Sequence, residues 1–333
     1  MSRVAVVGAG SWGTTFAKIL ADAGSDVTLW ARRAELAREI SETSRNSDYL
    51  RGINLPSQLM ADHDLARAVE GATTIYLAVP SQSLRANLEA LTPLLGEDTV
   101  LVSLMKGVES GSGLRMSEVI HAVTGVDEQR IAVVSGPNLA LEIAKEQPTA
   151  AVASSSSPET AAMVAKQATT AYFRMFVNHD VVGTEFGGVL KNLIAVAVGI
   201  ADGVGYGENT KASIITRGLA EISAFAAAFG AEPQTMAGLA GLGDLIATCE
   251  SPLSRNNTAG RLLGQGYALD DVIRRMNQTA EGLQAVTPVL ELAQSRGVAM
   301  PIVLQVQQVL AGQLDPAELA PHLATDSDEP QGE

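Results

Sequence analysis

Residues 4–17 read VAVVGAGSWGTTFA, which is a short apolar run, a glycine-rich turn and the start of an amphipathic segment. Gly8, Gly10 and Gly13 stand in the spacing G-x-G-x-x-G. In this spacing the first glycine permits a tight turn, the second lets the backbone approach a pyrophosphate, and the third lets a helix pack closely on a strand. The free amides and the positive end of the helix then face the anion. A glycine-rich turn without a ligand has the same pattern, but a strand before it and a helix after it favour a dinucleotide site.

The first half of the chain alternates short apolar runs with helical patterns. The predicted strands are residues 4–7, 27–30, 74–79, 100–103, 131–135 and 150–153, and the predicted helices include 12–23, 82–91 and 114–123. Apolar strands joined through helices indicate a parallel sheet that is covered on both faces. After a last strand at 172–177, long stretches with helical spacing take over, as at 212–229 and 288–295.

These patterns predict an α/β, Rossmann-like N-terminal domain with a mostly parallel sheet, followed by an all-α C-terminal domain. We place a dinucleotide-binding domain at residues 1–180 and a helical substrate-binding domain at 181–323. The remaining residues, 324–333, read ATDSDEPQGE and contain no large apolar side chain. We expect this acidic tail to be disordered.

Composition excludes several classes of protein. The 333 residues carry 23 Lys and Arg against 37 Asp and Glu, and the net charge of −14 disfavours binding to nucleic acid or to anionic lipid. The longest apolar stretch, residues 193–201, is far shorter than the roughly 20 residues of a membrane span. One cysteine, Cys249, and four scattered histidines give no disulfide and no metal-ligand spacing. We therefore expect a cytoplasmic protein without a membrane segment or a metal.

The second predicted strand ends in Ala31, Arg32 and Arg33, about twenty residues after the glycines. A fold selective for NAD usually has an acid at this place, whereas cations suit the 2′-phosphate of NADP. The residues therefore predict NADP binding in preference to NAD. Two features leave this open: both arginines can simply solvate the start of the next helix, and Glu35 lies close by.

Candidate catalytic residues in the first half follow predicted strands. Lys106 comes after the strand at 100–103, and Gly136-Pro137-Asn138 comes after the strand at 131–135. Both places belong near the carboxyl ends of the sheet, where such folds bind their ligands.

Candidates in the second half lie at polar interruptions of apolar segments. Lys191-Asn192 opens the apolar run, and a desolvated lysine is a good proton donor; a lysine whose head reaches water is the alternative. Further on, a glycine-rich turn precedes Asp244 and Thr248, and then Arg255-Asn256. Arg255 can bind a phosphate, or can begin a surface helix that Ser254 caps. We assign no role to Cys249.

Taken together, these segments resemble the bacterial NAD(P)-dependent glycerol-3-phosphate dehydrogenases. The matching segments are GAGSWGTTFA, LWARR, SLMKGVE, SGPNLA, GVLKNLIAVAVGIADG, GLGDLIATC, SRNNTAG and TAEG. They follow the order of the family from residue 4 to about residue 312. The resemblance implies reversible reduction of dihydroxyacetone phosphate to sn-glycerol 3-phosphate, the backbone precursor of phospholipids, with NADP or NAD as the cofactor. It also implies a homodimer.

The resemblance further implies roles for individual residues. Lys191 would be the proton donor in reduction and the acceptor in oxidation, with Lys106 and Asp244 beside the reacting group. The implied substrate contacts are Lys106, Gly136, Asn138, Lys191, Asn192, Asp244, Thr248, Ser254, Arg255 and Asn256. The implied cofactor contacts are Gly8, Gly10, Ser11, Trp12, Gly13, Arg32, Arg33, Lys106, Ala140, Arg255 and Glu281.

One departure from the family concerns Asn138-Leu139, where the family usually has Ser or Thr followed by Phe. The longer amide side chain changes the contact expected there. Two other interpretations stay open: a two-domain reductase of another small oxo or hydroxy acid, and a dinucleotide sensor without turnover.

Overall fold

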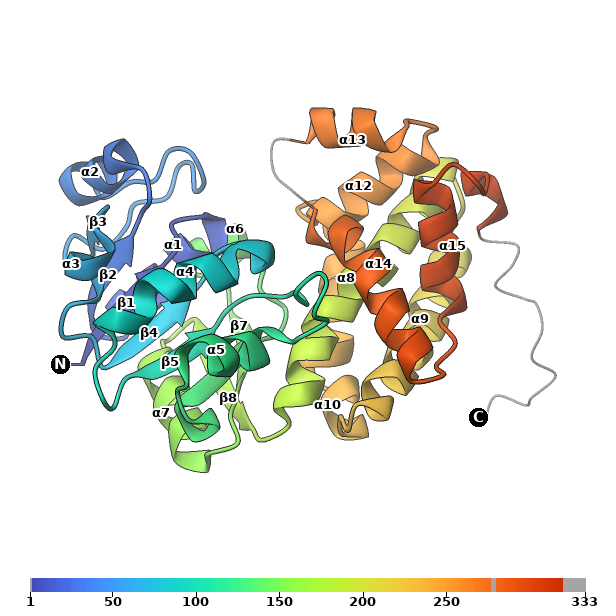
Figure 1. The fold of residues 1–333 in the computed structure, drawn as a ribbon. Helices are drawn as coiled ribbons and strands as arrows, with labels where there is room; N and C mark the ends of the chain where they lie inside the picture. Colours follow the sequence, from blue (N-terminus) through green and yellow to red (C-terminus); the bar gives the residue numbers. More distant parts are fainter. Residues whose placement is uncertain (1, 277–279, 320–333) are drawn as a thin grey trace. The chain divides into compact units, whose positions relative to one another are not determined.

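The computed structural model describes residues 2–276 and 280–319 (Figure 1). The predicted acidic tail at 324–333 lies outside the described residues, as does the end of the predicted helical domain.

Within the described residues, eight strands form one sheet in the order β3-β2-β1-β4-β5-β6-β7-β8. The strands are β1 Arg3–Val7, β2 Asp26–Trp30, β3 Met60–Asp62, β4 Thr74–Leu77, β5 Val100–Ser103, β6 Ile131–Ser135, β7 Thr149–Ser154 and β8 Phe173–Asn178. All neighbouring pairs are parallel except β6 and β7. The predicted mostly parallel sheet is confirmed, but strand β3 was not predicted. This edge strand has only three residues, and its Met60 is half-exposed. It therefore lacks the apolar run from which a strand could be predicted.

Helices cover both faces of the sheet (Figure 1). They are α1 Ser11–Asp22, α2 Ala34–Thr43, α3 Leu65–Val69, α4 Leu84–Leu91, α5 Met116–Thr124, α6 Ala140–Ala144 and α7 Pro158–Gln167. Strand β1 shows why both faces are apolar. Val4 and Val6 belong to one core cluster, whereas Ala5 and Val7 belong to another, because successive side chains point to opposite faces.

Beyond β8, the described part of the chain is mostly helical. Its helices are α8 Val181–Val204, α9 Glu208–Ala228, α10 Pro233–Ala237, α11 Asp244–Glu250, α12 Arg255–Gly264, α13 Leu269–Arg275, α14 Glu281–Ser295 and α15 Pro301–Leu310. A π-helical segment, Leu239–Gly243, precedes α11. The prediction of an all-helical second half is confirmed.

Helix α8 is longer than the apolar stretch at 193–201 suggested. It has 24 residues, and it is the one helix in the described part of the chain that is long and apolar enough to cross a membrane. However, 89% of its most apolar window is buried. Such burial is typical of the core helix of a globular protein.

Helices α8 and α12 approach closely at glycines. A Cβ on Gly260 would lie 2.1 Å from the Val196 carbonyl oxygen, and a Cβ on Gly199 would lie 2.2 Å from that of Asn257. The same holds one turn further on, where a Cβ on Gly203 would lie 2.2 Å from the Arg261 carbonyl oxygen. The missing side chains therefore let the two backbones touch.

The chain divides into two compact units. The first contains the described residues up to Val189 and the segment Phe229–Asp244, and the second contains Leu190–Ala228 and the described residues from Leu245 onward. The boundary that we predict near residue 180 coincides with the start of α8, and the domain limits stay a prediction.

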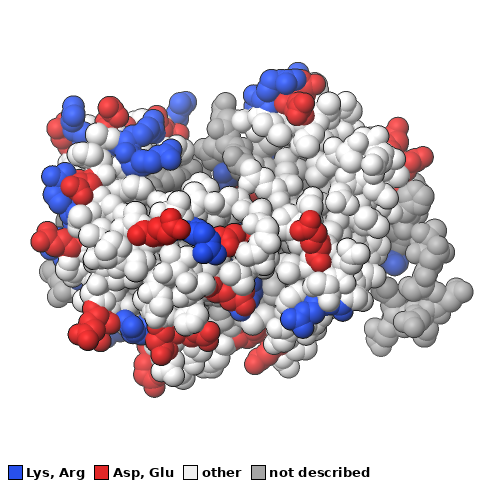
Figure 2. All heavy atoms as spheres, in the orientation of Figure 1, with Lys and Arg blue, Asp and Glu red and all other residues white. Residues whose placement is uncertain are grey.

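Charges of both signs are interspersed on the visible surface (Figure 2). No broad basic area stands out there, as expected from the net charge of −14. Any attraction for an anionic ligand must therefore come from a few local cations.

Candidate active site

The glycine-rich turn joins β1 to α1 in the first unit. Gly8 has φ +118°, and a Cβ there would lie 2.5 Å from the Ala78 carbonyl oxygen. A Cβ on Gly13 would lie 1.9 Å from the Gly8 carbonyl oxygen. In contrast, a Cβ on Gly10 would meet nothing within 4 Å. Gly8 and Gly13 are therefore required by the fold itself, whereas the space over Gly10 is available to a ligand.

The start of α1 can receive an anion. Its N-cap is Gly10, which offers no side-chain cap, so the first amides of the helix stay available. Among the described residues, the buried indole nitrogen of Trp12 has no hydrogen-bond partner. The Ser11 hydroxyl donates to the Tyr49 carbonyl oxygen at 2.8 Å. The open space, the uncapped helix and the unpartnered indole fit the pyrophosphate and ribose of a dinucleotide.

Sequence reasoning missed Asn46, which holds this turn. Asn46 is 1% exposed, and its Nδ2 donates to the Ala9 carbonyl oxygen at 3.0 Å and to Thr14 Oγ1 at 2.8 Å. Its Oδ1 accepts from the Tyr49 amide at 3.1 Å. The segment after α2 is thereby fastened to the glycine-rich turn. Residues 44–48 read SRNSD, and such a polar run has no periodicity from which the contact of Asn46 with the turn could be predicted.

The two arginines after β2, Arg32 and Arg33, are exposed. The guanidinium of Arg33 forms a short ion pair with Asp48, in the segment after α2. The hydrogen bond to Asp48 raises the pKa of Arg33. Asp48 was not predicted, although its position near Arg33 bears directly on the choice between NADP and NAD.

Lys106 is placed by the loop that follows β5. Its Nζ donates to the Gly136 carbonyl oxygen at 3.0 Å and to Asp244 Oδ2 at 2.5 Å. The side chain of Lys106 is 14% exposed and that of Asp244 is 2% exposed. Gly136 has φ +135°, and a Cβ there would lie 3.0 Å from Ala151 Cα, so this backbone position requires glycine. The structure thus brings together three predicted residues that are far apart in the sequence.

The loop after β6 carries unpartnered polar atoms. Within the described chain, both amide atoms of Asn138 and the hydroxyl of Ser135 are buried without a hydrogen-bond partner. Buried polar groups are nearly always paired in folded proteins, so such a cluster indicates a place for a ligand. Ala140 begins α6 directly after this loop, and its carbonyl oxygen accepts from Thr15 Oγ1 at 3.2 Å.

Lys191 lies in the second unit, within the buried helix α8. The residue is 6% exposed, and its Nζ donates to Thr248 Oγ1 on α11 at 2.5 Å. The alternative of a lysine whose head reaches bulk water is therefore wrong. The hydroxyl of Thr248 fixes the position of the ammonium group.

Asn192 follows Lys191 and belongs to a buried chain of amide contacts. Asn256 Nδ2 donates to Asn192 Oδ1 at 2.8 Å, and Asn256 Oδ1 accepts from the Gly282 amide at 2.9 Å. Asn256 thereby joins α8, α12 and the first turn of α14, in which Glu281 is the first residue.

Ser254 and Arg255 open helix α12. Ser254 Oγ accepts from the Asn257 amide at 3.2 Å, so the helix cap that we considered for Ser254 is confirmed. Arg255 is the first residue of the helix and is exposed. The cap does not exclude a ligand contact by the arginine. Cys249 is buried, and its carbonyl oxygen accepts from Asn257 Nδ2 at 2.9 Å.

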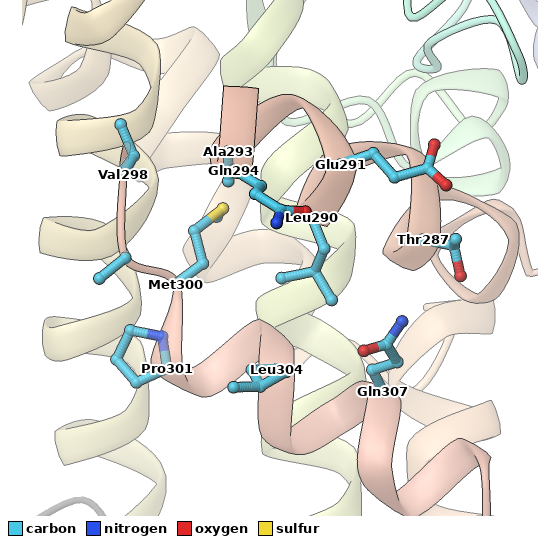
Figure 3. Close-up of a pocket in the computed structure, with 11 residues that line it drawn as sticks. Thr287, Leu290, Glu291, Ala293, Gln294, Val298, Met300, Pro301, Leu304 and Gln307 are labelled. Atoms are coloured by element: carbon cyan, nitrogen blue, oxygen red, sulfur yellow. The ribbon is translucent and has the colours of Figure 1, made fainter. Parts of the chain in front are cut away.

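A separate open hollow lies between α14 and α15 in the second unit (Figure 3). Its volume is about 590 Å³, and it is lined mainly by apolar side chains such as Leu290, Met300 and Leu304. None of the predicted catalytic or binding residues lines it. It is therefore not the candidate active site.

Residues 3–161 match the family model described as the N-terminus of NAD-dependent glycerol-3-phosphate dehydrogenase, and residues 180–321 match the model of its C-terminus.

Individual relatives agree with the family models. The chain is 70% identical to a glycerol-3-phosphate dehydrogenase (NAD(P)+) of Leifsonia xyli subsp. xyli, over 98% of this chain and 89% of that protein. It is 53% identical to a protein of the same name from Streptomyces griseus subsp. griseus, over 99% and 98% of the two chains. A crystal structure of glycerol-3-phosphate dehydrogenase from Coxiella burnetii is similar with a TM-score of 0.92, at 35% identity over 98% of this chain and 99% of that chain.

Proposed function

We propose a residue-level mechanism from the premise that this chain belongs to the NAD-dependent glycerol-3-phosphate dehydrogenase family. The chain is an oxidoreductase with glycerol-3-phosphate dehydrogenase (NAD(P)+) activity. This premise decides against the two other interpretations, a reductase of a different oxo acid and a sensor without turnover. The proposal concerns what each residue does in the reaction.

In the proposed reaction, dihydroxyacetone phosphate is reduced to sn-glycerol 3-phosphate. When bound, a reduced nicotinamide would supply the hydride for C2 of the ketone. Lys191 Nζ supplies the proton for the C2 oxygen, so that one hydride and one proton convert the carbonyl to the alcohol. In the reverse direction neutral Lys191 accepts this proton. Thr248, at 2.5 Å from Nζ, holds the ammonium group in place.

Lys106 and Asp244 are proposed to act on the same substrate. The charge of Lys106 attracts the anionic ketone and stabilises negative charge as it develops on oxygen. Asp244 fixes the position of Lys106, because its carboxylate accepts from Nζ at 2.5 Å. Gly188 on helix α8 lies against the Lys106 stem and leaves room for it. A Cβ on Gly188 would lie 3.2 Å from Lys106 Cγ.

The remaining substrate and cofactor contacts are proposed by position. Arg255 binds phosphate through its planar fork of donors, with Ser254, Asn256 and Asn192 nearby in the second unit. The unpaired amide of Asn138 and the backbone of Gly136 face the substrate from the loop after β6. On the cofactor side, we propose contacts from the glycine-rich turn, with Ser11 and Trp12, and from Arg32, Arg33, Lys106, Ala140, Arg255 and Glu281.

We also propose NADP as the preferred cofactor, because two arginines stand where an NAD-selective fold has an acid. A homodimer, a cytoplasmic location and a role in supplying the glycerophospholipid backbone complete the proposal. The family implies the homodimer and the metabolic role, and the location is the one expected from the single cysteine and the short apolar stretches.

The single observation that carries this mechanism is the burial of Lys191 with its Nζ held by a hydroxyl. We expect Lys191→Ala to lower turnover of dihydroxyacetone phosphate by about 10³-fold, since positioned acid–base groups contribute about 10²–10⁴-fold. NADPH binding, measured by fluorescence titration, should change by less than about threefold because Lys191 holds the substrate and not the dinucleotide.

The matched control is Lys211→Ala, which removes a lysine of the same unit that pairs with Asp202 and Glu208. It should leave turnover near the wild-type value. Near-wild-type turnover in Lys191→Ala, followed as loss of NADPH absorbance, excludes Lys191 as the proton donor. Repeating the assay with NADH measures the cofactor preference.

A further inference from the structure

Arg33, which we expect to bind the 2′-phosphate of NADP, is paired with an acidic residue, Asp48. Arg33 is the N-cap residue of α2, and its guanidinium forms a short ion pair with Asp48. The two side chains are 51% and 49% exposed, so a ligand can reach them. The Arg33 guanidinium also lies 5.8 Å from the centre of the Tyr49 ring.

The position of Asp48 is fixed by its neighbours. Buried Asn46 is bound to the glycine-rich turn through Ala9 and Thr14, and its Oδ1 accepts from the Tyr49 amide. The Tyr49 carbonyl oxygen accepts from Ser11 Oγ at 2.8 Å. Asp48 therefore stands between two residues that are anchored to the start of α1. These contacts hold the backbone of Asp48 in a fixed position relative to the glycine-rich turn.

Stability does not explain this arrangement. An ion pair between two half-exposed side chains contributes little to folding, because water and salt screen it. The segment is already held by Asn46 and by the Ser11 contact. Because the pair is weak and exposed, a ligand anion can compete with Asp48 for the Arg33 guanidinium.

We infer that Asp48 sets the cofactor specificity of this enzyme: by engaging Arg33 it lowers the affinity for a 2′-phosphate, so that NAD is accepted beside NADP. This inference rests on the proposed function, in which Arg33 faces the adenosine ribose. NAD-selective folds carry an acid at the end of the second strand. Here Arg32 and Arg33 occupy that place, and the acid comes from the segment after α2. A bound 2′-phosphate must compete with the Asp48 carboxylate for one guanidinium.

The test measures binding of two adenosine fragments to the full-length protein by calorimetry. The probes are 5′-AMP and 2′,5′-ADP, which differ in the 2′-phosphate alone. In Asp48→Asn we expect the Kd of 2′,5′-ADP to fall by about five- to tenfold, the size of one screened charge interaction at a protein surface. The Kd of 5′-AMP should stay within about twofold. The gain should shrink in 0.5 M salt, where the Debye length falls to roughly 4–5 Å.

The matched control is Asp271→Asn. Asp271 pairs with Arg274 on α13, and the Asp271 side chain is 48% exposed against 49% for Asp48. This variant should change neither Kd. Placing Asp48→Asn in an Arg33→Met background should reduce the gain to less than about twofold, because the acid acts through the arginine.

Two outcomes overturn the inference: an unchanged ratio of the two Kd values, or a gain that persists in full without Arg33. Oxidation of NADPH by the wild-type enzyme with dihydroxyacetone phosphate tests the proposed function separately. If wild-type turnover is present while Asp48→Asn leaves the ratio unchanged, the inference alone fails. If turnover is absent, the proposed function fails.

Discussion

The two units of the molecule hold their chemical groups in different ways. In the first unit, Lys106 and Asn46 lie in segments outside regular structure, and hydrogen bonds to backbone carbonyl oxygens fix them. In the second unit, Lys191 lies on a buried helix, and the close packing of α8 against α12 fixes that helix. Glycines therefore serve different purposes in the two units. In the first unit some leave room for a ligand, whereas along α8 and α12 they leave room for another backbone.

The largest change in the free energy of unfolding is expected for Gly260→Ala, in the second unit. Helix propensity by itself favours alanine by about 1 kcal/mol. Here the new Cβ would lie 2.1 Å from the Val196 carbonyl oxygen, so α8 and α12 must move apart. We expect the free energy of unfolding in urea to fall by about 3 kcal/mol, at the upper end of ordinary overpacking.

Gly207→Ala is the control for this prediction. Gly207 directly precedes α9, and a Cβ there would meet nothing within 4 Å. Its free energy of unfolding should stay within about 1 kcal/mol of the wild-type value. A Gly260→Ala protein as stable as this control would show that the two helices do not need their close approach.

The sequence predicted the first unit better than the second. The glycine spacing, the strand ends and Lys106 follow local rules, because tight turns and parallel strands constrain nearby residues. The contact of Lys106 with Asp244 joins residues 138 positions apart, and only folding reveals it. Asn46 and Asp48 were missed because their polar segment follows no period. In the second unit, the apolar run made Lys191 a candidate proton donor, but a solvated lysine remained an alternative until the structure placed its Nζ against Thr248.

Buried glutamates extend the comparison, since each unit uses one to cap a helix. Glu185 accepts from the Ser117 amide at the start of α5 and also pairs with Arg115 at 2.6 Å. Glu221 accepts from the amides of Ile302 and Val303 at the start of α15. Burial raises the pKa of both carboxyl groups, and it raises the pKa of Glu221 to about 7. In the helical unit, the pKa of Glu221 therefore predicts a pH dependence of stability near neutrality.

The second prediction is a loss of stability as pH rises. The folded-state pKa of Glu221, about 7, lies above the ordinary value of 4.5, so the folded protein binds this proton more tightly than the unfolded chain. The contribution is fully present below about pH 4.5 and is lost as pH rises to about 7. Between pH 5 and 8, the free energy of unfolding of the wild type should fall by about 2–3 kcal/mol relative to Glu221→Gln. Parallel urea titrations of both proteins measure this, and equal pH profiles would contradict the assignment.

The smallest effect on folding is expected for Gly10→Ala, the first unit's counterpart of Gly260→Ala. A Cβ on Gly10 meets no protein atom within 4 Å, and φ of −72° suits alanine. Loss of a glycine N-cap should lower the free energy of unfolding by less than about 1 kcal/mol. The methyl group would instead stand where we propose that the pyrophosphate approaches the backbone, and we expect the Kd for NADPH to rise by about tenfold, or 1.4 kcal/mol. Fluorescence titration beside urea unfolding separates the two effects. A stable Gly10→Ala protein that binds NADPH as the wild type does would mean that the open space over this glycine serves no ligand, and the contrast with the glycines of α8 and α12 would fail there.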